Sequence, residues 1–295
     1  MQTVMERLRD GLAEFPATER RVAHRILADY PVAGLQSASD LARDTGVSAP
    51  SVLRIGFASY PDFQRVMREE LTAQLSSPLN KLPPKSRRPS APGTPWLQSF
   101  VAKIEDNIGE TFRHLPAAEF EQTVALLADR RKQLHVIGGR FTDALAHYLS
   151  VQLRIVRPGV NHLRDQEANW YDQVLDMGKR DVLVIFDIRR YQASLLRLAQ
   201  AASRRQVSVV LITDQWLSPI SRLATHVLPA RIEAVSVWDS SVALMALTEA
   251  LLSEATRRQW DDGQKRMRAL EAMRAEVGDA ADPSNKPTGN GRKRG

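Results

Sequence analysis

The chain has 295 residues, enough for about two domains, and 43% of them are hydrophobic, so it can bury sizeable cores. It contains no cysteine, which excludes disulfides, thiol catalysis and cysteine zinc sites and is typical of a reducing compartment. The charged start lacks the apolar core of a signal peptide, and no apolar run approaches the ~20 residues of a membrane span. We therefore expect a cytoplasmic protein that has no membrane partner.

The net charge of +7 is unevenly distributed along the chain. Residues 78–95 hold four bases and no acid, and residues 256–295 hold ten bases and six acids. Residues 1–77, by contrast, hold nine arginines and ten acids. Because the basic excess lies in these two segments, composition alone supports nucleic-acid binding only weakly.

Helices are predicted for the first 35 residues, since Val4, Leu8 and Leu12 recur at helical spacing. Thr18 is expected to cap the second of these helices, and Tyr30-Pro31 to stop it.

The segment QSASDLARDTGVSAPSVLRIGFASYPDF, residues 36–63, predicts two short helices joined by a tight turn. Ser37 and Asp40 fit a capping box at the first helix, and Gly46 stands where a left-handed residue ends such helices. Ser48 can cap the second helix. This layout is typical of a helix-turn-helix, whose second helix enters the major groove, although a plain helical hairpin has the same pattern.

If the segment binds DNA, its contacts come from the helix starts and the second helix. The candidate DNA-binding residues are Ser37, Ser48, Ser51, Val52 and Arg54. Arg54 can reach a guanine edge or a phosphate. One short helix reads only a few base pairs, so we expect a homodimer or higher homo-oligomer, with the apolar helix 242–252 as its pairing surface.

The rest of the chain alternates short apolar strands with helices, which indicates a parallel sheet flanked by helices. Strands are predicted at residues 134–137, 159–163, 181–186, 207–213 and 226–229. The predicted fold class is therefore an all-α helix-turn-helix domain followed by an α/β domain. The predicted divisions are 1–77 for the DNA-binding domain, 78–95 for a Pro-rich basic linker, 96–255 for the α/β domain, and 256–295 for a charged helix and disordered tail.

Three segments together resemble the MurR/RpiR-type bacterial transcriptional regulators. The first segment runs from PATERRVAHRILADYP through the helix-turn-helix stretch to GFASYPDFQRVMREEL. The second is VIGGRFTDALAHYLSVQL, and the third is residues 181–229, which begin with DVLVIF and end with HVLP. The resemblance covers roughly residues 10–255. It implies an N-terminal helix-turn-helix that binds a double-stranded DNA operator, and a sugar isomerase (SIS) domain that senses a phosphosugar.

Two features depart from that family pattern. In the family, the loop after the third strand is usually rich in Ser and Thr with a glycine and holds the sugar phosphate, but here it is DIRRYQ. The loop after the first strand is usually Gly-rich with a serine, but here it is GGRFT. The candidate ligand-binding residues are Gly138, Arg140, Thr142, Asp187, Arg189, Arg190 and Gln192. The arginines either form an anion clamp for a small anionic metabolite or pair with Asp187 and Asp143 and close the pocket. The second helix of the helix-turn-helix also lacks about four residues, roughly one helical turn.

No catalytic residue, metal or cofactor is predicted. The six histidines lack metal-ligand spacing, and Gly138-Gly139-Arg140 lacks the spacing of a dinucleotide-binding motif. Trp170, Trp216 and Trp238 are interpreted as core or interface anchors. The sequence thus predicts a ligand-responsive DNA-binding regulator. The alternative is a sugar-phosphate isomerase or a related enzyme with the SIS fold.

Overall fold

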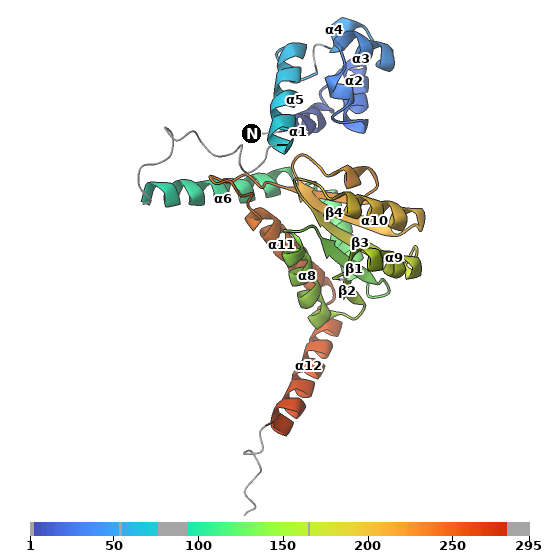
Figure 1. Cartoon of the computed structure of the whole chain (residues 1–295), viewed down its shortest axis with the longest axis vertical. Coiled ribbons are helices and arrows are strands. Elements are labelled where there is room, and N and C mark those ends of the chain that lie inside the picture. Colours follow the sequence, from blue (N-terminus) through green and yellow to red (C-terminus); the bar gives the residue numbers. More distant parts are fainter. Residues whose placement is uncertain (1–2, 53–54, 76–93, 165, 282–295) are drawn as a thin grey trace, which may run out of the picture.

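The computed structural model describes residues 3–52, 55–75, 94–164 and 166–281. Arg54, one candidate DNA-binding residue, lies outside the described residues, as do the four bases of the predicted linker and the predicted disordered end. The described part consists of a helical head, residues 3–75, and an α/β body, residues 94–281 (Figure 1).

The helical head has its own hydrophobic core, in which Val22, Ile26, Leu41 and Phe63 are fully buried. These side chains meet because the apolar positions of each helix recur on one face. The helices of the head are α1 Val4–Gly11, α2 Ala17–Ala28, the 3-10 helix η1 Ala33–Leu35, α3 Ala38–Thr45, α4 Ala49–Val52 and α5 Tyr60–Leu75.

Helix caps in the head differ in part from the predicted ones. The reciprocal capping box lies at Thr3 and Glu6. At α3 the Ser37 hydroxyl accepts from Asp40 N, as predicted, but the Asp40 carboxylate accepts from that hydroxyl at 2.6 Å, so this box is half formed. Thr18 lies inside α2, which begins after Pro16, so its predicted capping role is wrong. Proline supplies a suitable φ for a helix start without a side-chain cap.

The α/β body contains a five-stranded, fully parallel sheet in the order β2-β1-β3-β4-β5. The predicted parallel sheet flanked by helices is therefore confirmed. The strands are β1 Leu134–Gly138, β2 Val160–His162, β3 Val182–Asp187, β4 Ser208–Asp214 and β5 His226–Ala230. The helices are α6 Thr94–His114, α7 Ala117–Ala128, α8 Asp143–Val156, α9 Glu167–Asp176, α10 Ala193–Arg204, the 3-10 helix η4 Pro219–Arg222, α11 Val242–Arg258 and α12 Trp260–Ala281.

Both faces of the sheet are covered, which explains the continuous apolar strands. Along β3, Val184 and Phe186 belong to the core beneath α7, α8 and α11, whereas Leu183 and Ile185 belong to the core beneath α9 and α10. Since successive side chains of a strand point to opposite faces, a strand with helices on both sides must be apolar at every position.

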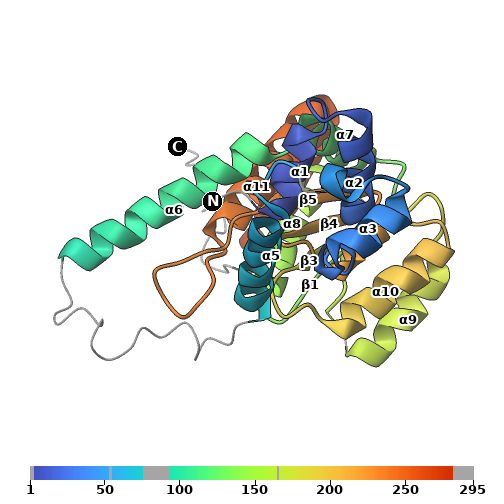
Figure 2. The same ribbon diagram turned by 90° about the horizontal axis from the view of Figure 1, so that it is seen from above.

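Helix α11 is not the exposed pairing surface that the sequence predicted. Leu244, Leu247 and Leu251 are fully buried in the core of the body itself. The larger exposed apolar surface is on the first half of α6, which projects from the body and carries Trp96 and Leu97 at 43% and 55% exposure (Figure 2).

The tryptophans divide between core and surface. Trp216 is 6% exposed, whereas Trp238 is 64% exposed and therefore anchors no core.

Among the described residues, no helix combines the length and hydropathy required to cross a membrane.

Candidate ligand-binding site

The loops that follow β1 and β3 meet at the carboxyl edge of the sheet, where ligands of open α/β folds bind. Between them lies a cavity of about 210 Å³. Every candidate ligand-binding residue except Gly138 contributes to its wall. The lining consists of Gly139, Arg140, Phe141, Thr142, Asp187, Ile188, Arg189, Arg190 and Gln192.

The loop after β1 is held tightly against β3 and α8. A Cβ atom at Gly138 would lie 2.5 Å from the backbone nitrogen of Asp143, so only glycine fits there. The Thr142 hydroxyl donates to the Phe186 carbonyl at 2.7 Å and accepts from Gly139 N at 2.9 Å. Thr142 is 2% exposed, so its hydroxyl holds the loop against β3 and is turned away from solvent.

The two loops are also tied directly to each other. Arg140 N donates to the side-chain oxygen of Gln192 at 2.8 Å, and Gln192 N donates to the Asp187 carboxylate at 3.3 Å. Gln192 therefore joins the two predicted ligand loops across the cavity.

The three arginines differ in what they can do. Arg140 and Arg190 are exposed at the cavity, and Arg190 has a left-handed backbone with φ 61. The Arg189 side chain is only 6% exposed, because its guanidinium lies 4.6 Å from the centre of the Trp216 ring and its Nε is 3.5 Å from Asp239 Oδ1. Arg140 and Arg190 are therefore the positive groups available to an incoming anion.

Asp187 is a buried carboxylate at the base of the cavity. It is 1% exposed and accepts from the Ser218 hydroxyl at 2.5 Å. Burial raises the pKa of Asp187 to about 6; the Ser218 and Gln192 hydrogen bonds oppose that rise, and the nearby Asp214 charge adds to it. With a pKa of about 6 the group is mainly ionised at neutral pH, so it serves there mostly as a hydrogen-bond acceptor for a hydroxyl.

Asp214, at the end of β4, was missed in the sequence. It is fully buried and accepts from Arg189 N at 2.6 Å, the Tyr191 hydroxyl at 2.8 Å and Trp216 N at 2.9 Å. Its pKa is raised by burial, against the lowering effect of these donors. The available signal was a carboxylate directly after a buried apolar strand, the same signal that marked Asp187.

The sequence left open that the arginines pair with Asp187 and Asp143, but these two carboxylates have other hydrogen-bond partners in the structure. Asp187 bonds to Ser218 and Gln192, and Asp143 Oδ1 lies 2.7 Å from His162 Nε2. His162 also accepts from Arg164 Nε at 2.7 Å and stacks on His147 with ring centres 5.3 Å apart. No group of three or more His, Asp or Glu side chains suited to a metal ion occurs within the described ranges.

The candidate DNA-binding residues are not equivalent either. Ser37 and Ser48 are exposed, and Ser51 is half-buried with its hydroxyl 3.0 Å from that of Ser48. Val52 is 0% exposed and packs in the core of the head, so its predicted contact with DNA is wrong. The apolar side of α4 has to face that core, because a four-residue helix is held by packing alone.

Comparison with known proteins identifies the class of the α/β body. Residues 126–254 match the family model described as the SIS domain, so the C-terminal region of the chain contains a SIS domain. No curated protein matches the chain.

Solved structures share this fold at low sequence identity. The sugar isomerase domain of an RpiR transcription factor from Sphaerobacter thermophilus is 21% identical, with a TM-score of 0.57, covering 61% of this chain and 99% of that one. The Vibrio vulnificus NanR protein complexed with ManNAc-6P is 18% identical, with a TM-score of 0.53, covering 92% and 98%. A protein from Escherichia coli CFT073, solved as a ligand complex, is 15% identical, with a TM-score of 0.50, covering 59% and 95%. The NanR likeness extends over the head as well as the SIS domain.

Proposed function

We propose that the protein is a DNA-binding transcriptional regulator whose SIS domain senses a small anionic metabolite, with a sugar phosphate as the first candidate. The observation that carries this proposal is the exposed α3–α4 unit of the head, joined in one chain to a SIS domain. Figure 1 shows α3 and α4 at the end of the head that faces away from the SIS domain, where a duplex has access.

The geometry of α3 and α4 supports a helix-turn-helix. Helix α3 ends at Gly46, whose φ of 64 is left-handed, and α4 begins at Ala49. Leu41 and Val52 are buried in the head core, while Ser48, Ala49 and Pro50 are exposed at the start of α4. In a helix-turn-helix the N-terminal residues of the second helix contact base edges.

The chemistry of the cavity supports an anionic effector. The exposed Arg140 and Arg190 offer positive charge, and helix α10 begins at the cavity, where the amides of a first helical turn favour anions. The buried Asp187 adds a hydrogen-bonding partner for a hydroxyl. These features suit a small polyol that carries one phosphate or carboxylate.

A sugar-phosphate isomerase is the alternative, since the SIS fold also occurs without a helical head. The Escherichia coli chain is one such case, because 95% of it is covered by only 59% of this chain. The exposed helical head favours the regulator, because an isomerase reaction makes no use of it.

A gel-shift assay with the protein's own upstream DNA tests the proposal. Wild type should shift that DNA more strongly than a scrambled duplex, and Ser48→Glu should weaken the shift at least about ten-fold, because a carboxylate at α4 repels phosphates. Ser253→Glu, on an exposed position of α11, is the matched control and should bind as wild type. Equal shifts of specific and scrambled DNA by all three proteins would reject sequence-specific binding at α4.

The proposed regulator is a dimer, because two heads double the length of DNA that is read. We assign the contact with the second copy to α6, in place of α11, because α6 exposes the apolar side chains of Trp96, Leu97 and Val101. Sedimentation should give a dimer for wild type and a shift toward monomer for Leu97→Glu. A monomeric wild type at micromolar concentration contradicts this assignment.

A further inference from the structure

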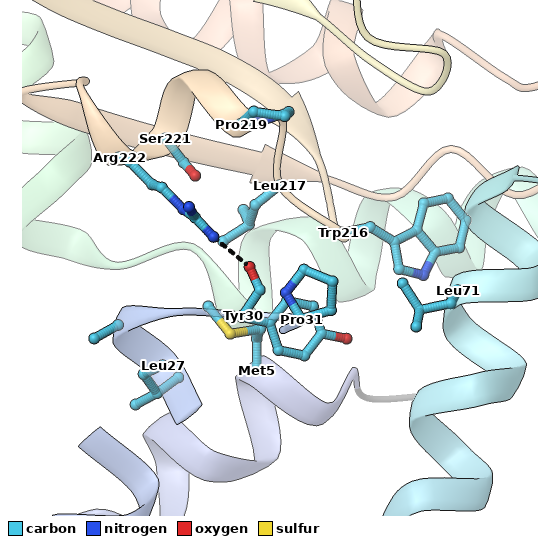
Figure 3. Close-up of a pocket in the computed structure, with 11 residues that line it drawn as sticks. Met5, Leu27, Tyr30, Pro31, Leu71, Trp216, Leu217, Pro219, Ser221 and Arg222 are labelled. Carbon is cyan, nitrogen blue, oxygen red and sulfur yellow. Dashed lines mark hydrogen bonds between the residues drawn. The ribbon is translucent and has the colours of Figure 1, made fainter. Parts of the chain in front are cut away.

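A second and larger cavity, about 390 Å³, lies between the helical head and the SIS domain (Figure 3). The head supplies Met5, Leu27, Ala28, Tyr30, Pro31 and Leu71 to its wall. Its volume falls in the range of small-molecule sites, and domain interfaces are a preferred location for such sites.

The wall on the SIS side comes from the segment after β4. It includes Trp216, Leu217 and Pro219, which are apolar, and Ser221 and Arg222, which are polar. Figure 3 shows the two polar side chains together, on the side away from Trp216. The cavity thus has an apolar interior and one polar end, where the Arg222 guanidinium is paired with the Asp29 carboxylate.

Arg222 can bind an anion at that end without giving up its present partners. Its Nη2 donates to the Tyr30 carbonyl at 3.0 Å and to the Asp29 carboxylate at 3.3 Å. A guanidinium carries five N–H donors, and both contacts use the same nitrogen, so donors remain for a carboxylate.

Leu217 provides an independent sign of function. Its backbone φ is 60, in the left-handed region that a leucine rarely adopts. Such strained residues gather at ligand clamps, where the surrounding structure holds them in place. The strain at Leu217 occurs within the wall of the cavity.

We propose that this cavity is a second ligand site, for a small molecule with an apolar body and a single carboxylate, the carboxylate facing Arg222. Such a ligand touches the head and the SIS domain together, so it stabilises the arrangement in which they are docked. The site does not depend on the proposed DNA-binding function.

The cavity also adjoins the first ligand site through a shared segment. Trp216 lines the cavity, packs on the Arg189 guanidinium and donates its backbone N–H to Asp214, which also accepts from Arg189 N. Occupancy of either cavity therefore acts on the same residues, which is the physical condition for coupling between two sites.

Calorimetric titration of the full chain with 1-naphthylacetate and with octanoate tests the proposal. At least one of the two acids should bind with one molecule per chain, about ten-fold more tightly than its uncharged amide, because the amide lacks the charge-assisted contact. In Arg222→Met this preference for the acid should disappear, while the apolar stem of the side chain is kept.

Filling the cavity provides the second arm of the test. Ala28 is exposed and lines the cavity at the end of α2, so Ala28→Phe should weaken acid binding at least about ten-fold. Ala17→Phe, an exposed position at the other end of the same helix, should leave it unchanged. Failure of both acids to bind wild type overturns the proposal, as does equal binding to wild type and Ala28→Phe.

Discussion

At the scale of single residues, Asp187 is a buried carboxylate whose environment differs strongly from that of a surface carboxylate. Burial raises its pKa from 3.8 to about 6, so the protonated form is favoured in the folded protein. The resulting stability is fully present below about pH 4 and is lost as the pH rises through about 6. Asp187→Asn cannot lose a proton, yet its amide oxygen can still accept from Ser218.

We therefore expect Asp187→Asn to be more stable than wild type above pH 6, by on the order of 2–3 kcal/mol, and nearly equal to it at pH 4. Urea unfolding between pH 4 and 8 measures this difference. Asp172→Asn, an exposed carboxyl on α9, is the control and should run parallel to wild type. Parallel curves for Asp187→Asn would mean that burial does not perturb this carboxyl.

The arginines at the first cavity should separate into two kinds. The double variant Arg140→Ala/Arg190→Ala lacks both exposed guanidinium groups. It should bind an anionic effector more weakly than wild type, with little change in stability. Arg189→Ala removes a buried side chain from Trp216 and should lower the melting temperature of the protein by several degrees. Thermal-shift titration with sugar phosphates and sugar acids distinguishes the two. Loss of binding in Arg189→Ala alone, at unchanged stability, would reverse the assignment.

At the scale of elements, the contact between β1 and α8 requires a glycine. In Gly138→Ala the new Cβ would meet backbone atoms of Thr142 and Asp143 at about 2.5 Å, so strand or helix must move. We expect a loss of at least about 2 kcal/mol in the free energy of unfolding, measured by urea titration. Gly109→Ala is the matched control: it lies exposed within α6 with no atom in reach, so it should gain up to about 1 kcal/mol. A stable Gly138→Ala would show that the loop can retreat from α8.

At the scale of the whole molecule, a buried ion pair joins the head to the SIS domain. Arg231 Nη2 lies 2.5 Å from Glu6 Oε2, and the two side chains are 6% and 14% exposed. Removing one partner of such a pair leaves the other charge buried and costs about 3–5 kcal/mol. Glu6→Gln keeps the capping function of the residue at Thr3 but removes its charge.

We expect Glu6→Gln to release the head, so that the radius of gyration from small-angle scattering increases. Glu254→Gln removes a carboxylate that pairs with Arg257 and Arg258 and takes no part in the interface, so it should leave the scattering curve unchanged. If Glu6→Gln scatters as wild type, the ion pair does not hold the head in place.

The local sequence pattern alone determined the helices of the head and the alternation of strands and helices that produces a parallel sheet. Both follow from the period of apolar residues and from continuous apolar strands such as β3, and neither depends on distant partners. The loops GGRFT and DIRRYQ were recognisable as a possible site for the same reason, because each directly follows a strand.

Tertiary structure decided which of the predicted site and surface residues are exposed to a ligand or partner. Arg189 and Arg190 are neighbours in sequence, yet one lies on Trp216 and the other is exposed, since the ring comes from the loop that follows the next strand, β4. Val52 and α11 were assigned to surfaces, but the cores of the head and of the SIS domain cover them. Burial depends on what the rest of the chain packs against a residue, so periodicity can identify an apolar face without showing what covers it.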